Sequence, residues 1–272
     1  MKLAICNEVW RDTPIETIFA KAAAIGFDGV ELAPFTLADS VETISADRRR
    51  EIVKAAADAG VEIVGLHWLF VSPKGLHLTT PDETVRRRSA DYLKALADFC
   101  ADVGGKVMIF GSPGQRDLVP PVTYDEGWAR AKEVYAAAAD TLQARGVTLC
   151  IEALAPAETN FIQTADEAAK MADEIGHPNI DIMLDVKAMA SMPDGIIGTT
   201  AKFGSRAKHY HVNDPSGKGP GMNGTEFGPI LDALAKTDFN GWVSAEPFDY
   251  KPDPDTVART AYETLTAAAG NR

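Results

Sequence analysis

Four polar residues stand at the ends of consecutive apolar segments in the second half of the chain. Glu152 ends VTLCIE, Asp185 ends IDIMLD, His211 lies near the end of AKHYHV, and Glu246 ends GWVSAE. If these segments are neighbouring parallel strands, their carboxyl ends meet at one edge, and three carboxylates and an imidazole converge there. Three buried carboxylates without a cation would repel one another strongly. The pattern therefore predicts a divalent metal ion held by these four residues.

The ligand types limit the choice of metal. Three carboxylates and one histidine suit a hard or borderline ion with roughly octahedral coordination, which leaves positions for water or substrate oxygens. We expect one ion per chain, with Mn²⁺ as the first choice and Mg²⁺ or Co²⁺ as alternatives. A lone carboxylate at a strand end is more often a helix N-cap or an ion-pair partner, but four polar residues on consecutive strands are hard to explain in that way. His209 is expected to face away from His211 in a regular strand, and it is interpreted as a packing residue or as a residue that supports the metal ligands from behind.

The rest of the sequence supplies the elements that would position these residues. Short β-branched apolar segments alternate with longer helical segments, which is typical of repeated βα units around a parallel sheet. Glycines that precede strands, as in AAAIGFDGV and LQARGVTLC, fit helix C-caps. Eight strands are expected, at residues 2–6, 29–33, 62–66, 106–110, 147–152, 180–185, 207–212 and 241–246. The predicted fold is an α/β (β/α)₈ TIM barrel with its active site at the C-terminal face of the strands.

Length, charge and cysteine content narrow the class of protein. The 272 residues, 46% of them hydrophobic, fit one barrel domain over 1–272. The chain has 27 Lys and Arg against 39 Asp and Glu, and a formal net charge of -12 disfavours nucleic acid and membrane surfaces as partners. The sequence shows no apolar segment of about 18 residues and no leader-like start, so we expect a cytoplasmic protein. Cys6, Cys100 and Cys150 have no paired spacing and are expected to be reduced.

Further polar and aromatic residues follow strands at the same predicted end. Glu8 follows the first strand. His67 follows the third strand, and it could either contact the substrate or be a buried structural histidine. The Trp68 ring could cover the apolar face of a sugar, although rim packing also explains it. Arg116, in the segment GSPGQR, could bind an anion together with the neighbouring glycines, or the segment could be a simple turn.

These residues resemble those of a known family. The four predicted ligands, together with ETNF at 158–161, LDVKAM at 184–189 and HVND at 211–214, are similar to the xylose-isomerase-like barrel superfamily. Within it the chain resembles the sugar isomerase and epimerase branch, which includes the D-tagatose and D-psicose 3-epimerases. The resemblance covers nearly the whole chain. It implies that Glu152 and Glu246 bind the metal and also act as acid and base, and that Glu158 hydrogen-bonds the sugar.

The resemblance implies a divalent-metal-dependent isomerase or epimerase for a ketose or a sugar acid. With a metal polarising the carbonyl and its neighbouring hydroxyl, a carboxylate can remove the proton between them and give an enediolate. Return of a proton from the opposite side inverts the carbon, whereas return to the neighbouring carbon converts ketose and aldose. Homo-oligomers, as dimers or tetramers, are common in this family.

The chain departs from the epimerase pattern at two places. Those enzymes have a histidine three residues after the metal aspartate, where this chain has Ala188 preceded by Lys187. They also have an arginine after the metal histidine, where this chain reads NDPSGKGPGMNG, with Lys218 as the nearest cation. A cation at Lys187 suggests that a different oxygen, or a carboxylate, of the substrate is bound there.

Two other reactions therefore stay open. A metal-dependent lyase or decarboxylase acting on an oxo-sugar or oxo-sugar acid is the main alternative, because the same chemistry can expel a carbon or oxygen group. An abasic-site endonuclease, from the same superfamily, is a remote alternative. Five histidines and a net charge of -12 do not suit the several metals and the basic groove that such an enzyme needs.

Overall fold

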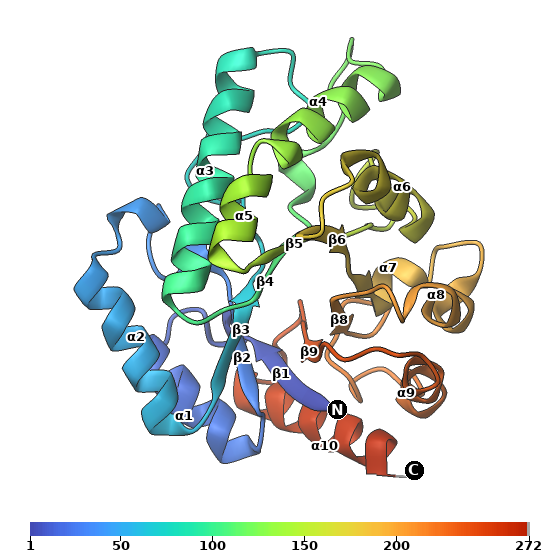
Figure 1. Cartoon of the computed structure of the whole chain (residues 1–272). Coiled ribbons are helices and arrows are strands. Elements are labelled where there is room, and N and C mark those ends of the chain that lie inside the picture. Colours follow the sequence, from blue (N-terminus) through green and yellow to red (C-terminus); the bar gives the residue numbers. More distant parts are fainter. Residues whose placement is uncertain (271–272) are drawn as a thin grey trace.

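The strands of the computed structural model, which describes residues 1–270, form a parallel barrel (Figure 1). The strands are β1 Lys2–Cys6, β2 Gly29–Leu32, β3 Glu62–Leu66, β4 Val107–Phe110, β5 Thr148–Ile151, β6 Ile180–Ile182, β7 Leu184–Asp185, β8 His209–Val212 and β9 Trp242–Ala245. They are hydrogen-bonded in the order β6-β5-β4-β3-β2-β1-β9-β8-β7, and the pairs are parallel. The predicted α/β barrel is therefore confirmed.

The segment predicted as one strand at 180–185 is divided at Met183 into β6 and β7. β6 pairs with β5, whereas β7 pairs with β8. The two ends of the strand order are thus parts of one chain segment, and the barrel closes there. On either side of the break, the Met183 N–H donates to the Ile151 carbonyl at 3.3 Å and the Lys208 N–H donates to the Ile182 carbonyl at 3.0 Å.

Helices surround the strands on the outside of the barrel (Figure 1). The α-helices are α1 Ile15–Ile25, α2 Ala46–Ala59, α3 Glu83–Asp102, α4 Tyr124–Ala136, α5 Ala139–Arg145, α6 Ala165–Ile175, α7 Val186–Met189, α8 Gly195–Phe203, α9 Phe227–Ala235 and α10 Pro254–Gly270. The 3-10 helices are η1 Asn7–Trp10, η2 Pro34–Thr36, η3 Val41–Thr43 and η4 Pro113–Gln115. Gly26 and Gly146 end α1 and α5 in the left-handed conformation, as the sequence predicts. Because β1 pairs with β9, the first and last strands complete the ring.

The barrel interior changes from apolar to polar along the strands. A small apolar cluster inside the barrel consists of Ala4, Val64, Val107, Ile109, Cys150 and Met183. Two positions further along their strands, Glu152 and Asp185 follow Cys150 and Met183 on the same side of the sheet. Apolar packing thus supports the strands directly below a polar layer at their C-terminal ends.

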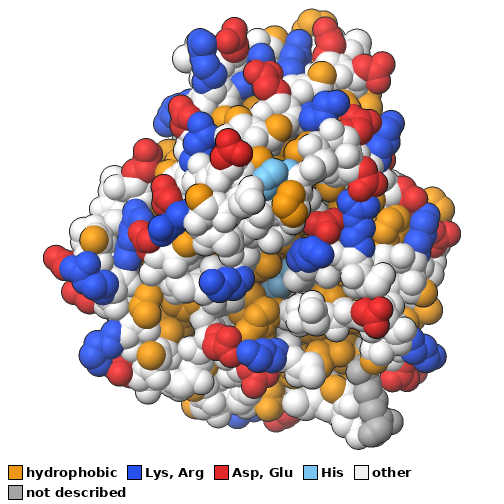
Figure 2. All heavy atoms as spheres, in the orientation of Figure 1, with side chains coloured by type: hydrophobic (Ala, Val, Ile, Leu, Met, Phe, Trp, Pro, Cys, Tyr) orange, Lys and Arg blue, Asp and Glu red, His pale blue; other side chains and the backbone are white. Residues whose placement is uncertain are grey.

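Three further features concern the helices, the surface charge and the cysteines. Among residues 1–270, no helix is long and apolar enough to cross a membrane. On the face in Figure 2, Lys and Arg side chains are interspersed with Asp and Glu, so this face has mixed charge. Cys6, Cys100 and Cys150 are free and buried, which confirms the expectation that they are unpaired.

Candidate metal centre and active site

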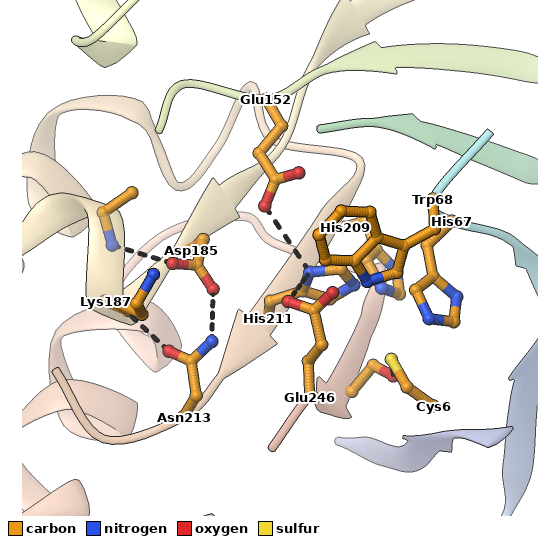
Figure 3. A network of polar contacts seen from close by, with 12 residues as sticks. Cys6, His67, Trp68, Glu152, Asp185, Lys187, His209, His211, Asn213 and Glu246 are labelled. Carbon is orange, nitrogen blue, oxygen red and sulfur yellow. Dashed lines mark hydrogen bonds and ion pairs between the residues drawn. The ribbon is translucent and has the colours of Figure 1, made fainter. Parts of the chain in front are cut away.

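The four predicted metal ligands meet at the C-terminal ends of β5, β7, β8 and β9. One ligand atom from each of Glu152, Asp185, His211 and Glu246 lies within 4.8 Å of the others. His211 Nδ1 is 3.0 Å from a Glu246 oxygen and 3.7 Å from a Glu152 oxygen. Each residue is no more than 5% exposed. Figure 3 shows their side chains pointing into the same space.

A buried nitrogen without a hydrogen bond, at the centre of this group, tests whether a metal ion fits. His211 Nε2 lies 3.2 Å from both carboxylate oxygens of Glu31, which leaves Nδ1 facing the other acids. Nδ1 is buried and makes no hydrogen bond, although the carboxylates of Glu152 and Glu246 face it. One divalent cation would satisfy this nitrogen and the surrounding carboxylate oxygens together. The residues present therefore fit a metal ion.

Burial and mutual repulsion raise the pKa values of two acids in this group. Burial raises the pKa of Glu246 to about 8; the charge of Glu152 adds to the rise, and His211 opposes it. Burial, with the charge of Glu152, raises the pKa of Asp185 to about 6. Without a cation the group relieves its repulsion by keeping protons, and a divalent ion must displace them.

Asp185 is oriented by hydrogen bonds to both of its oxygens. It is the N-cap of α7, and its Oδ1 accepts the Ala188 N–H at 2.7 Å. Its Oδ2 accepts the Asn213 side-chain amide at 2.8 Å, and Asn213 Oδ1 in turn accepts the Lys187 N–H at 2.9 Å. The N-cap interpretation of a lone carboxylate thus applies to Asp185. It does not compete with metal binding, because each oxygen keeps a further lone pair.

The position of Glu152 depends on its two neighbours in space. A Cβ on Gly111 would lie 1.7 Å from Glu152 Oε2, so a larger residue at 111 would displace the carboxylate. On the other side, Arg116 is fully buried and donates from its guanidinium to the Glu152 carbonyl at 2.6 Å. Arg116 was a predicted substrate contact, but it does not line the cavity at the metal ligands and instead holds the backbone that carries Glu152.

A buried carboxylate beneath the metal ligands, Glu31 on β2, is absent from the predicted site. It is 0% exposed, and His209 Nε2 lies 2.8 Å from it. Burial opposes its ionisation, but the charges and hydrogen bonds of His209 and His211 outweigh burial and hold the pKa of Glu31 well below its ordinary value. The signal in the sequence is a single acid inside the apolar segment GVELA.

The prediction that His209 faces away from His211 is wrong. Side chains two residues apart on a strand point to the same side. Both rings contact Glu31, and their centroids are 4.9 Å apart. Of the two interpretations of His209, the contact with Glu31 agrees with the one that has it support the metal ligands from behind.

Replacement of Glu31 by Gln should weaken metal binding. The Glu31 carboxylate accepts the Nε2 proton of His211 and so keeps Nδ1 as the nitrogen that faces the metal; partners of this kind contribute about 10- to 100-fold in metal affinity. We expect a loss of that size in Mn²⁺ affinity, measured by isothermal titration calorimetry, with an unchanged circular dichroism spectrum. The control is Glu62→Gln, an exposed acid on β3. Wild-type affinity in the Glu31 variant would contradict this role.

A narrow cavity beside the metal ligands is lined by several predicted substrate contacts. Its lining residues are His67, Trp68, Gly111, Pro113, Glu152, Leu154, Glu158, Asp185, Lys187, Glu246 and Phe248. Its volume is about 20 Å³, which is room for about one water. A sugar therefore needs rim side chains to move outward. Trp68, whose φ of 52° is strained for a bulky residue, meets Phe248 edge to face with ring centroids 6.4 Å apart.

Lys187 and Glu158 form an ion pair at the mouth of this cavity. Their side chains are 19% and 26% exposed, and Lys187 Nζ lies 5.1 Å from the centroid of the Phe248 ring. The positive charge that suggests an acidic substrate is thus already matched by a carboxylate of this chain.

Of the remaining predicted contacts, His67 lines the cavity and Lys218 does not. His67 Nε2 contacts the Glu8 carboxylate, and Trp68 Nε1 donates to the other Glu8 oxygen at 3.1 Å. His67 is therefore both a partnered buried histidine and a cavity-lining residue, so its two interpretations hold together. Lys218 does not line the cavity; its backbone forms an isolated bridge with Asp249.

The chain is similar to known proteins over most of its length. A family model described as xylose isomerase-like TIM barrel matches residues 19–268. D-psicose 3-epimerase of Ruminiclostridium cellulolyticum is 28% identical over 232 residues, covering 84% of this chain and 76% of that protein. Fructoselysine 3-epimerase of Escherichia coli O157:H7 is 22% identical over 263 residues, covering 93% of both chains.

Solved structures share the fold. The structure of D-psicose 3-epimerase with D-tagatose from Clostridium cellulolyticum H10 superimposes with a TM-score of 0.86 at 23% identity, and the match covers 99% of both chains. That of 3-keto-D-glucoside 4-epimerase from E. coli has a TM-score of 0.83 at 18% identity, again over 99% of both chains. With the family model matching most of its length, the chain belongs to the xylose isomerase-like TIM barrel family.

Proposed function

We propose that this protein is a divalent-metal-dependent sugar epimerase or isomerase that acts on an uncharged ketose. The observation that carries the proposal is the buried group of Glu152, Asp185, His211 and Glu246, in which the carboxylates of Glu152 and Glu246 face a His211 nitrogen that makes no hydrogen bond. Relatives named as 3-epimerases of psicose, ribulose and fructoselysine support this reaction class. Mn²⁺ is the first choice of ion, with Mg²⁺ or Co²⁺ as alternatives.

The proton transfers fall to two carboxylates in the group. When bound, the divalent ion polarises the ketose carbonyl and its neighbouring hydroxyl. Glu152, after β5, and Glu246, after β9, reach His211 Nδ1 from different strands. A substrate carbon held between them loses its proton to one carboxylate and, through an enediolate, receives a proton from the other. If the two carboxylates act on opposite faces of that carbon, the transfer inverts it, which is 3-epimerisation.

Proton exchange in D₂O tests the proposal directly. With Mn²⁺ present and a panel of free ketohexoses and ketopentoses, we expect deuterium at the carbon next to the carbonyl and the appearance of the second epimer in NMR spectra. Isomerisation would give an aldose instead of the epimer. No deuterium in any ketose would overturn the proposal, and release of CO₂ from an oxo-sugar acid would support the lyase alternative.

The charge of the substrate can be tested at the cavity mouth. Glu158 neutralises Lys187, so Glu158→Gln should leave a free cation that attracts a carboxylate. A hydrogen bond to a charged group contributes about 1.5–3 kcal/mol, so we expect the inhibition constant of a sugar acid to fall about tenfold or more relative to that of a matched neutral sugar. Lys187→Gln leaves the Glu158 carboxylate alone and should move the same ratio in the opposite direction. A ratio unchanged in both variants would contradict this explanation.

Further parts of the proposal come from the sequence. We infer a single domain, a cytoplasmic location, a homo-oligomeric state and no nucleic-acid partner. The net charge of -12 and the mixed charge in Figure 2 support the last of these, and the three buried free cysteines suit a reducing compartment. Light scattering on a size-exclusion column would establish the oligomeric state.

A further inference from the structure

A second and larger cleft lies next to the metal cavity. It has a volume of about 760 Å³, which is within the usual range of about 300–1,000 Å³ for ligand pockets. Trp68 and Phe248 line both the cleft and the metal cavity. A ligand whose reacting end passes these two rings therefore has its other end in the cleft.

The walls of this cleft are rich in aromatic side chains. Trp10, Phe35, Trp68, Phe248 and Tyr250 all line it. Phe248 is 37% exposed, which is unusual for so large an apolar residue in this chain. The Trp10 ring is fixed in place because its Nε1 donates to an Asp255 oxygen at 2.6 Å. Phe248 is the exposed ring of this set, whereas Phe35, Trp68 and Tyr250 are partly buried. Aromatic side chains of this kind suit a ligand that has an apolar face and polar edges, as a sugar ring does.

The polar groups of the cleft carry opposite charges. Arg11 and Asp12 line it together with the Glu8 carboxylate. The Arg11 guanidinium lies over the Phe35 ring, 5.2 Å from its centroid. Arg11 is the only Lys or Arg among the described residues that line the cleft. A cleft with acidic and basic groups side by side favours a ligand with many hydroxyl groups over a phosphate or another strong anion.

We infer that this cleft binds a second sugar unit joined to the reacting ketose, so that the preferred substrate is a glycosylated ketose. The inference rests on the proposed function, because the ketose end must reach the metal ligands. A free ketose would fill only the inner end past Trp68 and Phe248. A glycosidic bond near these rings places the second sugar against Phe35 and Tyr250.

The test compares D-fructose with D-fructose that carries a glucosyl group on its C6 hydroxyl, which leaves the ketone free to react. For the Mn²⁺-loaded enzyme, we expect kcat/KM for deuterium exchange to be at least tenfold higher for the glucosylated ketose. Phe35→Ala should remove most of this preference and leave kcat/KM for D-fructose unchanged, because Phe35 lines the cleft and not the metal cavity. Ile197→Ala, an exposed apolar residue on α8, is the matched control.

A binding measurement separates this inference from the proposed reaction. Trp10 and Trp68 line the cleft, so titration of the protein with methyl α-glucoside should change its tryptophan fluorescence, and Phe35→Ala should weaken this binding about tenfold. Equal kcat/KM for the two ketoses, or a Phe35 variant that keeps the wild-type preference, would overturn the inference. If neither ketose exchanges deuterium, the proposed reaction has failed, and the fluorescence titration alone decides: saturable binding that is lost in Phe35→Ala supports the cleft, and its absence overturns it.

Discussion

Glu152→Gln combined with Asp185→Asn should leave the protein unable to hold its metal ion. The double variant removes two of the four candidate ligands and leaves only His211 and Glu246. After loading and dialysis, we expect elemental analysis to find about one Mn²⁺ per wild-type chain, because the four residues form one group of ligands, and almost none in the variant.

Thermal stability gives a second readout of the same prediction. A ligand present at about 100 times its Kd stabilises a protein by about 2.7 kcal/mol. Mn²⁺ at that level should therefore raise the Tm of the wild type and not that of the double variant. Glu42→Gln with Asp47→Asn, two exposed acids, is the matched control. If the double variant still bound a full complement of metal, these four residues could not be the site.

Glu246→Gln should separate proton exchange from epimerisation. In the proposed reaction each glutamate serves one face of the substrate carbon, so the variant keeps Glu152 for one epimer and has no carboxylate for the other. We expect interconversion of the epimers to fall by about 10²- to 10⁴-fold, the usual contribution of a general acid or base. Exchange of deuterium into the epimer that Glu152 deprotonates should fall much less.

The two rates can be followed together by NMR in D₂O. Mn²⁺ is supplied at a saturating concentration, determined by calorimetry for each variant, because Glu246 is also a candidate ligand. Glu246→Asp, which keeps a carboxylate, should recover part of the interconversion. If exchange and interconversion fell equally for both epimers with the metal bound, a single carboxylate would serve both faces, and the two-glutamate mechanism would be wrong.

The convergence of the candidate ligands could be predicted because it depends on strand order alone. In a parallel barrel the C-terminal end of each strand lies at the same face, so Glu152, Asp185, His211 and Glu246 had to lie near one another once the strands were recognised. Their individual contacts could not be predicted. The Asp185 oxygens, for example, take hydrogen bonds from Ala188 and Asn213 that depend on the local path of the chain after β7.

Residues in loops were harder to place. Arg116 and Lys218 are cations in segments that follow strands, and their sequence context does not say whether the side chain points into the barrel mouth or under a loop. Arg116 binds backbone carbonyls in the interior, and Lys218 lies outside the cavity. Glu31 was overlooked for a different reason: a single acid in an apolar strand gives a weak signal, and its histidine partners His209 and His211 are distant in sequence.

The strand that carries Asp185 changes neighbours halfway along its length. Among the described residues, β6 pairs with β5 up to Ile182, whereas β7 pairs only with β8. An ion bound by Glu152 and Asp185 would link the end of β5 to the end of β7, beyond the point where their backbones share a ladder. The cation would then connect these two strand ends as well as serve as a cofactor. Loss of the ion should therefore loosen the contact between the ends of β5 and β7, although the chain itself and the backbone hydrogen bonds at Met183 and Lys208 still close the barrel.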